Sequence, residues 1–185
     1  MPALIEVDTD TMRRMIYDLK ATEQQADKAM FSTMSKMAAW VRTRSVRGLS
    51  DKLKIQQKIL RGRTRTFRWH GGGSSSVLRN GDMKVWYGLN PVPWSRLNPR
   101  ASKKGGVAAA GNRHDPEAFI ANYGGHPEVL KRKGKARNPL EVIKADIHDP
   151  SVTYIEDFVL AGAEFENQFM KIFERELKWR TATRR

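Results

Sequence analysis

Three neighbouring side chains, His114, Asp115 and Glu117, are of the types that bind metal ions or serve as acid and base in a nuclease. Asp115 precedes Pro116, a pair typical of a turn, and no second histidine lies in the same predicted element. We therefore interpret the three as solvent-exposed residues at the start of a strand, and we expect neither a metal nor another cofactor. The chain also has no cysteine and no GxSxG or GxxxxGK[ST] motif. Because no set of nucleophile, base and orienting residue can be assembled, the sequence predicts that the protein is not an enzyme.

Positive charge is concentrated in the middle of the chain. The 185 residues include 34 Lys and Arg against 20 Asp and Glu, a net charge of +14. Residues 41–140 hold 22 of the basic residues and five of the acidic ones, a local net of +17, whereas the two ends together have a net of −3. This asymmetry favours anionic partners and makes association sensitive to salt. Nucleic acid is the first candidate partner and an acidic protein surface the second; the plain alternative is a surface tuned for solubility.

Clusters of basic side chains are the candidate contact residues. Phosphate contact needs only mobile cations and no base-specific readout. The two-residue spacing of Arg61, Arg63 and Arg65 predicts that these side chains point one way from an extended segment. The full candidate set, for DNA or an acidic partner, is Arg42, Arg44, Arg47, Arg61, Arg63, Arg65, Arg68, Lys103, Lys104, Lys131, Arg132, Lys133, Lys135 and Arg137.

Tryptophans accompany these cations. Trp69, Trp86 and Trp94 have the ring type on which single-strand binders stack bases. Packing in the core or at a subunit interface is the interpretation that we favour for them. No RNP, KH, zinc-finger or helix-turn-helix pattern is visible. The sequence therefore supports a surface that faces phosphates and does not support sequence-specific recognition.

A long helix is predicted to begin the chain. Apolar residues spaced by three and four predict helix over about 9–47, and its methionines are interpreted as core. Asp8 or Thr9 offers the N-cap, and Gly48 offers the stop. A short second helix is predicted over about 51–60.

A second long helix is predicted over about 150–179. Asp149 offers its cap, with Pro150 at the first helical position. The apolar stripe consists of Ile155, Phe158, Val159, Phe165, Phe169, Ile172, Phe173 and Leu177. The acidic residues Glu156, Asp157, Glu164 and Glu166 are interpreted as its solvated face.

Between the helices the apolar period changes to two, which predicts an antiparallel sheet over about 64–145. Asn80-Gly81 predicts a hairpin, and Gly124-Gly125 predicts a second turn between residues 118–123 and 128–132. Residues 101–112 read as a long exposed loop. The predicted fold is a single α+β domain over 1–185: a long N-terminal helix, an antiparallel β-sheet with long loops, and a long C-terminal helix packed on the sheet.

A series of short segments resembles the minor tail protein Z family of tailed bacteriophages, also called tail completion proteins. Its members are KIQQKI at 54–59, the arginine run 61–65, VWYGLNPVP at 85–93, GNRH at 111–114, AFIA at 118–121 and GKARNPLE at 134–141. Their order and spacing resemble those of the family over about residues 50–145, and the flanking helices are similar to its layout. One departure is Asp149-Pro150-Ser151, where the family leads us to expect Gly-Pro-Ser.

The resemblance implies a structural virion protein that completes the tail at its head-proximal end, in the neck, where it serves head–tail joining and the positioning of the DNA end. It also implies a homo-oligomeric ring around the DNA path, often a hexamer, which contacts other tail and neck proteins. For its basic residues, the phosphates of packaged double-stranded DNA and acidic neighbours in the neck are the two candidate partners. The expected location is the virion, and the host cytoplasm during assembly. No membrane partner is expected, because the longest apolar run is far shorter than the ~20 residues that span a bilayer. A non-specific nucleic-acid-binding accessory protein is the second hypothesis, and a nuclease that uses His114, Asp115 and Glu117 is the third.

Overall fold

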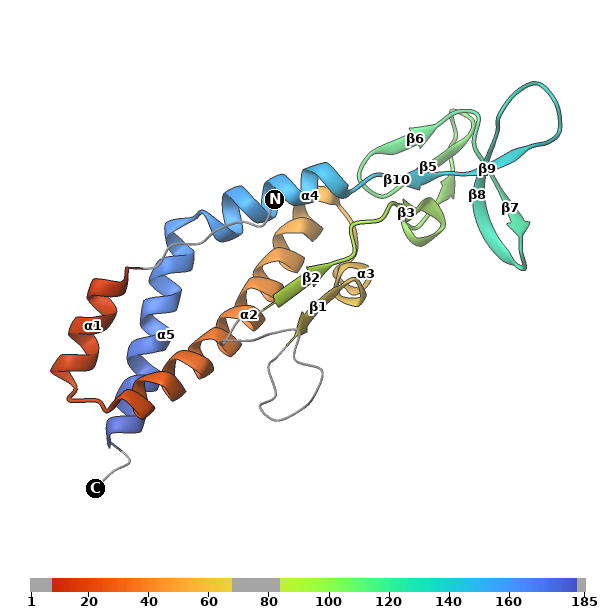
Figure 1. The fold of residues 1–185 in the computed structure, drawn as a ribbon. Coiled ribbons are helices and arrows are strands. Elements are labelled where there is room, and N and C mark those ends of the chain that lie inside the picture. The colour runs from red at the N-terminus through yellow and green to blue at the C-terminus, as the bar shows by residue number, and fades with distance from the viewer. Residues whose placement is uncertain (1–7, 68–83, 183–185) are drawn as a thin grey trace. The chain divides into compact units, whose positions relative to one another are not determined.

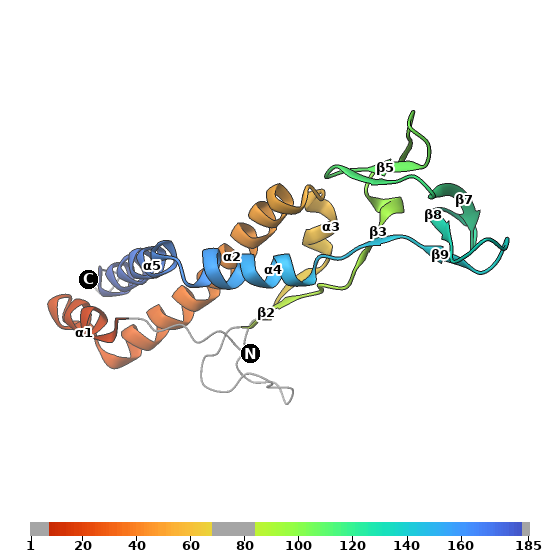
Figure 2. The same ribbon diagram turned by 90° about the horizontal axis from the view of Figure 1, so that it is seen from above.

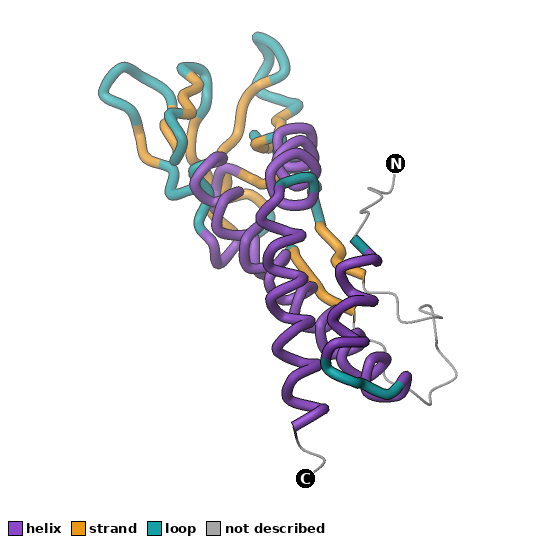
Figure 3. Tube along the Cα trace, turned by 90° about the vertical axis from the view of Figure 1, so that its left-hand side faces the viewer, coloured by secondary structure: helices purple, strands orange, loops and turns teal. Residues whose placement is uncertain are grey.

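The computed structural model describes residues 8–67 and 84–182, and it has the α+β class that the sequence predicts. Within the chain, contacts are concentrated in two compact units. Unit 1 comprises Met1–Ser45, Thr64–Tyr87 and Thr153–Arg185, and unit 2 comprises Val46–Arg63 and Gly88–Val152. Helices make up most of unit 1, whereas strands and loops make up most of unit 2 (Figures 1 and 3). Across the described ranges, no helix has both the length and the apolarity that crossing a bilayer requires.

The predicted helix over 9–47 is interrupted. Helix α1 spans Thr9–Asp18 and helix α2 spans Glu23–Leu53. Lys20, in the connection, has a left-handed φ of 48°. Thr22 and Gln25 form a capping box: the Thr22 N–H donates to Gln25 Oε1, and the Gln25 N–H donates to Thr22 Oγ1. The first backbone N–H groups of a new helix have no partner within that helix. The capping box supplies partners for them, so a new helix can begin here.

Asp8 caps α1, as predicted. Its Oδ1 accepts hydrogen bonds from the backbone N–H groups of Asp10 and Thr11, at 2.9 and 3.1 Å. Hydrogen bonds from the Thr11 side chain and backbone hold the pKa of the Asp8 carboxyl below its usual value. The cap therefore keeps its charge at neutral pH, where the positive end of the helix dipole favours it.

Helix α2 continues through Gly48, where the sequence predicts a stop. Val46, Leu49 and Leu53 are buried at spacings of three and four, so continuing the helix extends its apolar stripe. A glycine inside a helix costs only about 1 kcal/mol relative to alanine, which this burial outweighs. The helix ends instead before Lys54, whose φ is 53°. Helix α3 then spans Gln57–Gly62, and not 51–60.

Three helical segments replace the single helix predicted over 150–179. They are α4 (His148–Tyr154), the π-helix η2 (Ile155–Leu160) and α5 (Ala163–Ala182). The predicted Asp149 cap is wrong, because the His148 N–H donates to Asp146 Oδ1 at 3.0 Å. Asp149 lies instead in the first turn of α4.

The π-helix changes which side chains face the core. The Ala161 N–H donates to the carbonyl oxygen of Glu156 at 2.9 Å, a hydrogen bond over five residues instead of four. The extra residue per turn shifts the stripe, and Phe158, predicted in the core, is 63% exposed. Its ring stacks on Tyr154 with the centroids 5.6 Å apart. Every other member of the predicted stripe is buried.

The core of unit 1 lies among helices. Helix α1 lies beside α5, and the first part of α2 lies beside the C-terminal end of α5 (Figures 1 and 2). The buried cluster consists of Met12, Ala29, Met37, Val41, Val159, Phe165, Phe169, Ile172, Phe173 and Leu177. The methionine stripe is therefore core, as predicted. Val85 packs against the same cluster, so α5 meets mainly helices and little sheet.

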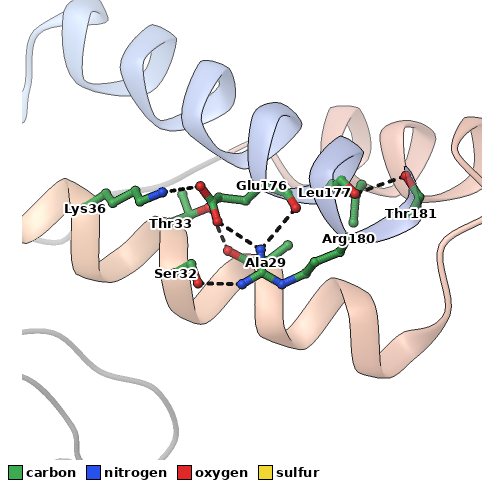
Figure 4. Close-up of polar contacts among 8 residues, drawn as sticks. All are labelled: Ala29, Ser32, Thr33, Lys36, Glu176, Leu177, Arg180 and Thr181. Carbon is green, nitrogen blue, oxygen red and sulfur yellow. Dashed lines mark hydrogen bonds and ion pairs between the residues drawn. The ribbon is translucent and has the colours of Figure 1, made fainter. Parts of the chain in front are cut away.

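A partly buried ionic network joins α2 to α5 beside this core (Figure 4). The carboxylate of Glu176, whose side chain is only 10% exposed, is bonded to Lys36 Nζ and, at 2.9 Å, to Arg180 Nη1. Arg180 Nη2 also donates to Ser32 Oγ at 2.6 Å. Gln25 donates to the Arg180 carbonyl oxygen at 3.0 Å, which adds a further link between the two helices.

The predicted sheet over 64–145 is divided into four small antiparallel sheets in the described residues. The first sheet pairs β1 (Thr64–Phe67) with β2 (Lys84–Tyr87), and the second pairs β3 (Val92–Pro93) with β10 (Lys144–Ala145). The third sheet consists of β4 (Arg100–Ala101), β5 (Val107–Ala109) and β6 (Arg113–Asp115). The fourth consists of β7 (Phe119–Tyr123), β8 (His126–Arg132) and β9 (Leu140–Val142). Residues 101–112, predicted as an exposed loop, thus include strand residues, and Val107 is buried. The Asn80-Gly81 hairpin lies outside the described residues.

The turn at Gly124-Gly125 is confirmed. It joins β7 to β8, with Tyr123 opposite His126 and Phe119 opposite Leu130. Both glycines have positive φ, 61° and 84°, which a two-residue hairpin turn of type I′ requires at both positions. This register brings the basic end of β8 beside the start of β7.

Candidate nucleic-acid interface

The arginine run 61–65 does not present one basic face. Arg61 belongs to helix α3, where its Nη2 donates to Gln57 Oε1 at 3.1 Å. Arg63 follows the helix, and its guanidinium donates to the carbonyl oxygens of Gly88 and Asn90. Only Arg65 lies in a strand, β1. The prediction that the three point one way is therefore wrong, because a helix end separates them.

The arginines of α2 also have separate environments. Arg42 is half-buried, and Arg44 forms an ion pair with Glu164 of α5. Arg47 is exposed. Arg68 lies outside the described residues. These cations therefore do not form one site that the structure brings together.

The remaining candidates lie on two hairpins of unit 2. Lys103 and Lys104 are exposed in the turn between β4 and β5. Lys131, Arg132, Lys133, Lys135 and Arg137 lie on the end of β8 and in the connection to β9. An open cleft of about 690 Å³ is lined by Glu117, Phe119, Lys131, Arg132, Lys133, Gly134 and Lys135. We call this the basic cleft; four cations and one carboxylate line it.

Lys131 is neutralised at one side of the basic cleft. Its Nζ lies 2.9 Å from Glu117 Oε2 and 3.2 Å from Asp115 Oδ2. Hydrogen bonds to Glu117 and Asp115 raise the pKa of the Lys131 ammonium above its usual value. Burial by itself would raise the pKa of Asp115, but the Glu117 N–H and Lys131 outweigh it, so this pKa is lowered. Lys131 and Asp115 therefore stay charged at neutral pH, and the positive charge of Lys131 is taken up by these carboxylate contacts.

The other cations of this region remain available to an anion. The Arg132 guanidinium lies over the Phe119 ring, 5.8 Å from its centroid. Lys133 Nζ is 3.9 Å from Glu141 Oε2, and since both side chains are exposed this pair is worth little. Among the residues that the structure describes, Lys135 and Arg137 have no acidic partner. The cleft can thus offer several cations to phosphate groups, one of them held in place by an aromatic ring.

The sequence did not identify Phe119 as part of the site. Its neighbour in the cleft is Arg132, thirteen residues away, and the two meet only through the β7–β8 register. The one available signal was the Gly124-Gly125 turn, which fixes that register.

The three residues of the nuclease hypothesis form contacts with other groups in the structure. His114 Nε2 is hydrogen-bonded to the carbonyl oxygen of Gly105 at 2.9 Å. Asp115 and Glu117 are bonded to Lys131. Over the described part of the chain, no group of three or more His, Asp or Glu side chains is arranged to hold a metal ion. Each of the three side chains thus has a structural partner.

The tryptophans divide between core and surface. Trp94 is buried, as predicted for a packing role. Trp86 is 46% exposed in β2, so it is not a core residue of this chain. Trp69 lies outside the described residues.

The turn that carries Lys103 and Lys104 depends on a glycine. Gly106 has a φ of 71°, and a Cβ there would lie 2.0 Å from the backbone oxygen of Asp115. We expect Gly106→Ala to lower the free energy of unfolding by about 3 kcal/mol, from the left-handed backbone and the backbone clash together. Gly105→Ala is the matched control: its φ is 86°, but its Cβ would meet nothing within 4 Å, so about 1 kcal/mol is expected. Urea unfolding of both variants tests this, and equal losses would contradict the clash.

The chain matches no family model, no curated protein and no solved structure.

Proposed function

We propose that this protein is a structural component of a tailed bacteriophage or prophage that completes the tail at its head-proximal end and joins it to the head. It acts as a ring around the DNA path, with other tail and neck proteins as neighbours, and its location is the virion. The observation that carries the proposal is the ordered series of segments between residues 54 and 141 that resembles the tail protein Z family.

The positions of these segments are consistent with a structural role. GNRH at 111–114 covers the turn into β6, AFIA at 118–121 leads into β7, and GKARNPLE at 134–141 forms the connection from β8 into β9. Residues of these types shape turns and strand ends, which a subunit needs in order to present its loops to neighbours. The proposal therefore assigns no catalytic residue and no cofactor.

The basic cleft supports a DNA-facing role for part of unit 2. Its available cations can contact phosphates without reading bases, as a protein that holds any DNA end requires. The same surface also supports the second candidate, a non-specific nucleic-acid-binding accessory protein. The two candidates differ in stoichiometry: a ring closes at a fixed number of subunits, whereas a coating protein binds in proportion to DNA length.

Light scattering with duplexes of increasing length separates the two candidates. For the tail protein we expect a discrete multiple of the 21.1 kDa chain that does not depend on duplex length. A bound mass that grows with duplex length, and that dissociates at high salt, would replace the tail proposal with the accessory protein.

The contribution of the basic cleft to DNA binding, together with that of Arg137 in the same connection from β8 to β9, can be measured separately. We expect the combined variant Lys133→Glu, Lys135→Glu and Arg137→Glu to reduce the slope of log K against log salt by about 3, since about one counterion is released per phosphate contact. The control variant Lys28→Glu, Lys171→Glu and Arg175→Glu reverses the same number of positive charges at exposed positions of helices α2 and α5. Equal loss of duplex affinity in both variants would show that net charge, and not the cleft, determines binding.

A further inference from the structure

The two-stranded sheet of unit 1 has an outer face of aromatic and basic side chains. Arg65 lies directly opposite Trp86, and Phe67 directly opposite Lys84. All four side chains are exposed, whereas Thr64 and Thr66 on the alternate positions of β1 are buried or half-buried. Phe67 and Trp86 are each 46% exposed. Within the described residues neither Arg65 nor Lys84 has an acidic partner. We call these four residues the basic face.

The π-helix η2 carries the opposite arrangement. Glu156, Asp157 and Phe158 are consecutive and exposed, and in the described chain neither carboxylate has a cationic partner. Phe158 is 63% exposed although it stacks on Tyr154. The acidic knob, as we call these three residues, thus has two negative charges and one large exposed ring. Pi-helical turns of this kind occur frequently at functional sites.

We propose that the basic face of one copy docks on the acidic knob of a second copy. Arg65 and Lys84 face Glu156 and Asp157 across this contact, while Phe158 packs against Phe67 and Trp86. Because the two surfaces differ, the contact is heterologous: each copy uses its basic face toward one neighbour and its acidic knob toward the other. Such contacts close into a ring or continue as a filament. This inference rests on the proposed function only for the expectation that the ring closes.

A second copy fits these observations better than nucleic acid does. A polyanion could cover the basic face, but it would be repelled by the acidic knob and would leave Phe158 exposed. A second copy covers both surfaces in one contact, with complementary charge and with three aromatic rings excluded from water. Aromatic and arginine side chains at the centre of an interface contribute most of its binding energy, and the flanking charges set the orientation of the partners.

Charge reversal with mixing tests the contact directly. The variant Arg65→Glu/Lys84→Glu is acidic on both surfaces, and the variant Glu156→Lys/Asp157→Lys is basic on both. By sedimentation equilibrium at low salt we expect each variant alone to associate at least about tenfold more weakly than the unchanged chain, from like-charge repulsion. Mixed in equal amounts, the two variants should associate again, because every contact between them pairs opposite charges. The control Lys28→Glu/Lys171→Glu reverses two exposed cations elsewhere in unit 1 and should associate as the unchanged chain does.

Three outcomes would overturn the contact. The first is an unchanged chain that stays monomeric at low salt at every concentration measured. The second is an oligomer that both reversed variants form equally well; the ring of the proposed function would then stand on a different interface. The third is an Arg65→Glu/Lys84→Glu variant that loses binding to an oligo(dT) strand but keeps its self-association, which would assign the basic face to nucleic acid. Failure of the tail proposal is recognised separately, by a bound mass that grows with duplex length.

Discussion

Replacing Glu176 with alanine is expected to lower the free energy of unfolding of unit 1 by about 3 to 5 kcal/mol, as is usual when one partner of a buried ion pair is removed. The side chains of Glu176 and Arg180 are 10% and 13% exposed. Without the carboxylate, the Arg180 guanidinium would stay largely buried with no anionic partner, and would keep Ser32 Oγ, the Glu176 carbonyl oxygen and the Trp179 ring as its neutral partners. The loss of its counterion is therefore costly at this position, whereas most ion pairs among the described residues are exposed.

The stabilising effect of Glu176 depends on pH in a defined direction. Burial by itself raises the pKa of this carboxyl, but the hydrogen bonds and charges of Lys36 and Arg180 outweigh it, so the pKa is lowered in the folded chain. A lowered folded-state pKa means that the stabilisation is fully present above the unfolded value of about 4.3 and is lost as the pH falls through the folded value. The difference in stability between the unchanged chain and Glu176→Ala should therefore be largest at neutral pH and shrink in acid.

Urea unfolding followed by circular dichroism at pH 7 and at pH 3 measures this difference. Glu174→Ala is the matched control, since Glu174 lies on the same helix and forms an exposed ion pair with Lys178 at 2.6 Å. Such an exposed pair is worth about 0.5 kcal/mol, so the control should change little. A Glu176→Ala loss that is the same at both pH values would mean that the side chain contributes packing and no charge interaction.

The helices show how far local patterns determine this fold. Period 3.6 identified the stripes of α2 and α5 because their core residues are spaced regularly along each helix. The break after α1 had a visible signal in Thr22 and Gln25, a capping box that was outweighed by the periodicity around it. The exposure of Phe158 had none, because a π-turn depends on how the backbone is accommodated in tertiary structure.

The candidate site was predictable only in its composition. The cations at 131–137 were identified from sequence, and the Gly124-Gly125 turn gave the hairpin that carries them. The sequence could not predict which cations are neutralised, because Lys131 of β8 contacts Asp115 of β6, which lies sixteen residues earlier in the chain. The prediction for the arginine run was wrong for a related reason. Residues spaced by two lie on one face only in a strand, whereas Arg61 belongs to helix α3.

The second large effect is expected at Phe173. Its ring is 1% exposed and stacks beside Phe169, at the centre of the cluster that joins α5 to α1 and α2. Phe173→Ala removes the ring and leaves a cavity, which together cost about 3 to 5 kcal/mol. Because domains are typically stable by only about 5 to 15 kcal/mol, this variant should unfold at much lower urea or temperature than the unchanged chain.

Phe158→Ala makes the same substitution on the surface and serves as the control. Phe158 is 63% exposed, so its loss should cost at most about 1 kcal/mol, from the stacking on Tyr154. The two variants should therefore separate stability from association: Phe173→Ala lowers the unfolding midpoint, whereas Phe158→Ala keeps it and weakens self-association through the acidic knob. A Phe158→Ala variant that unfolds as easily as Phe173→Ala would place that ring in the core, and the acidic knob would then lose its aromatic contact.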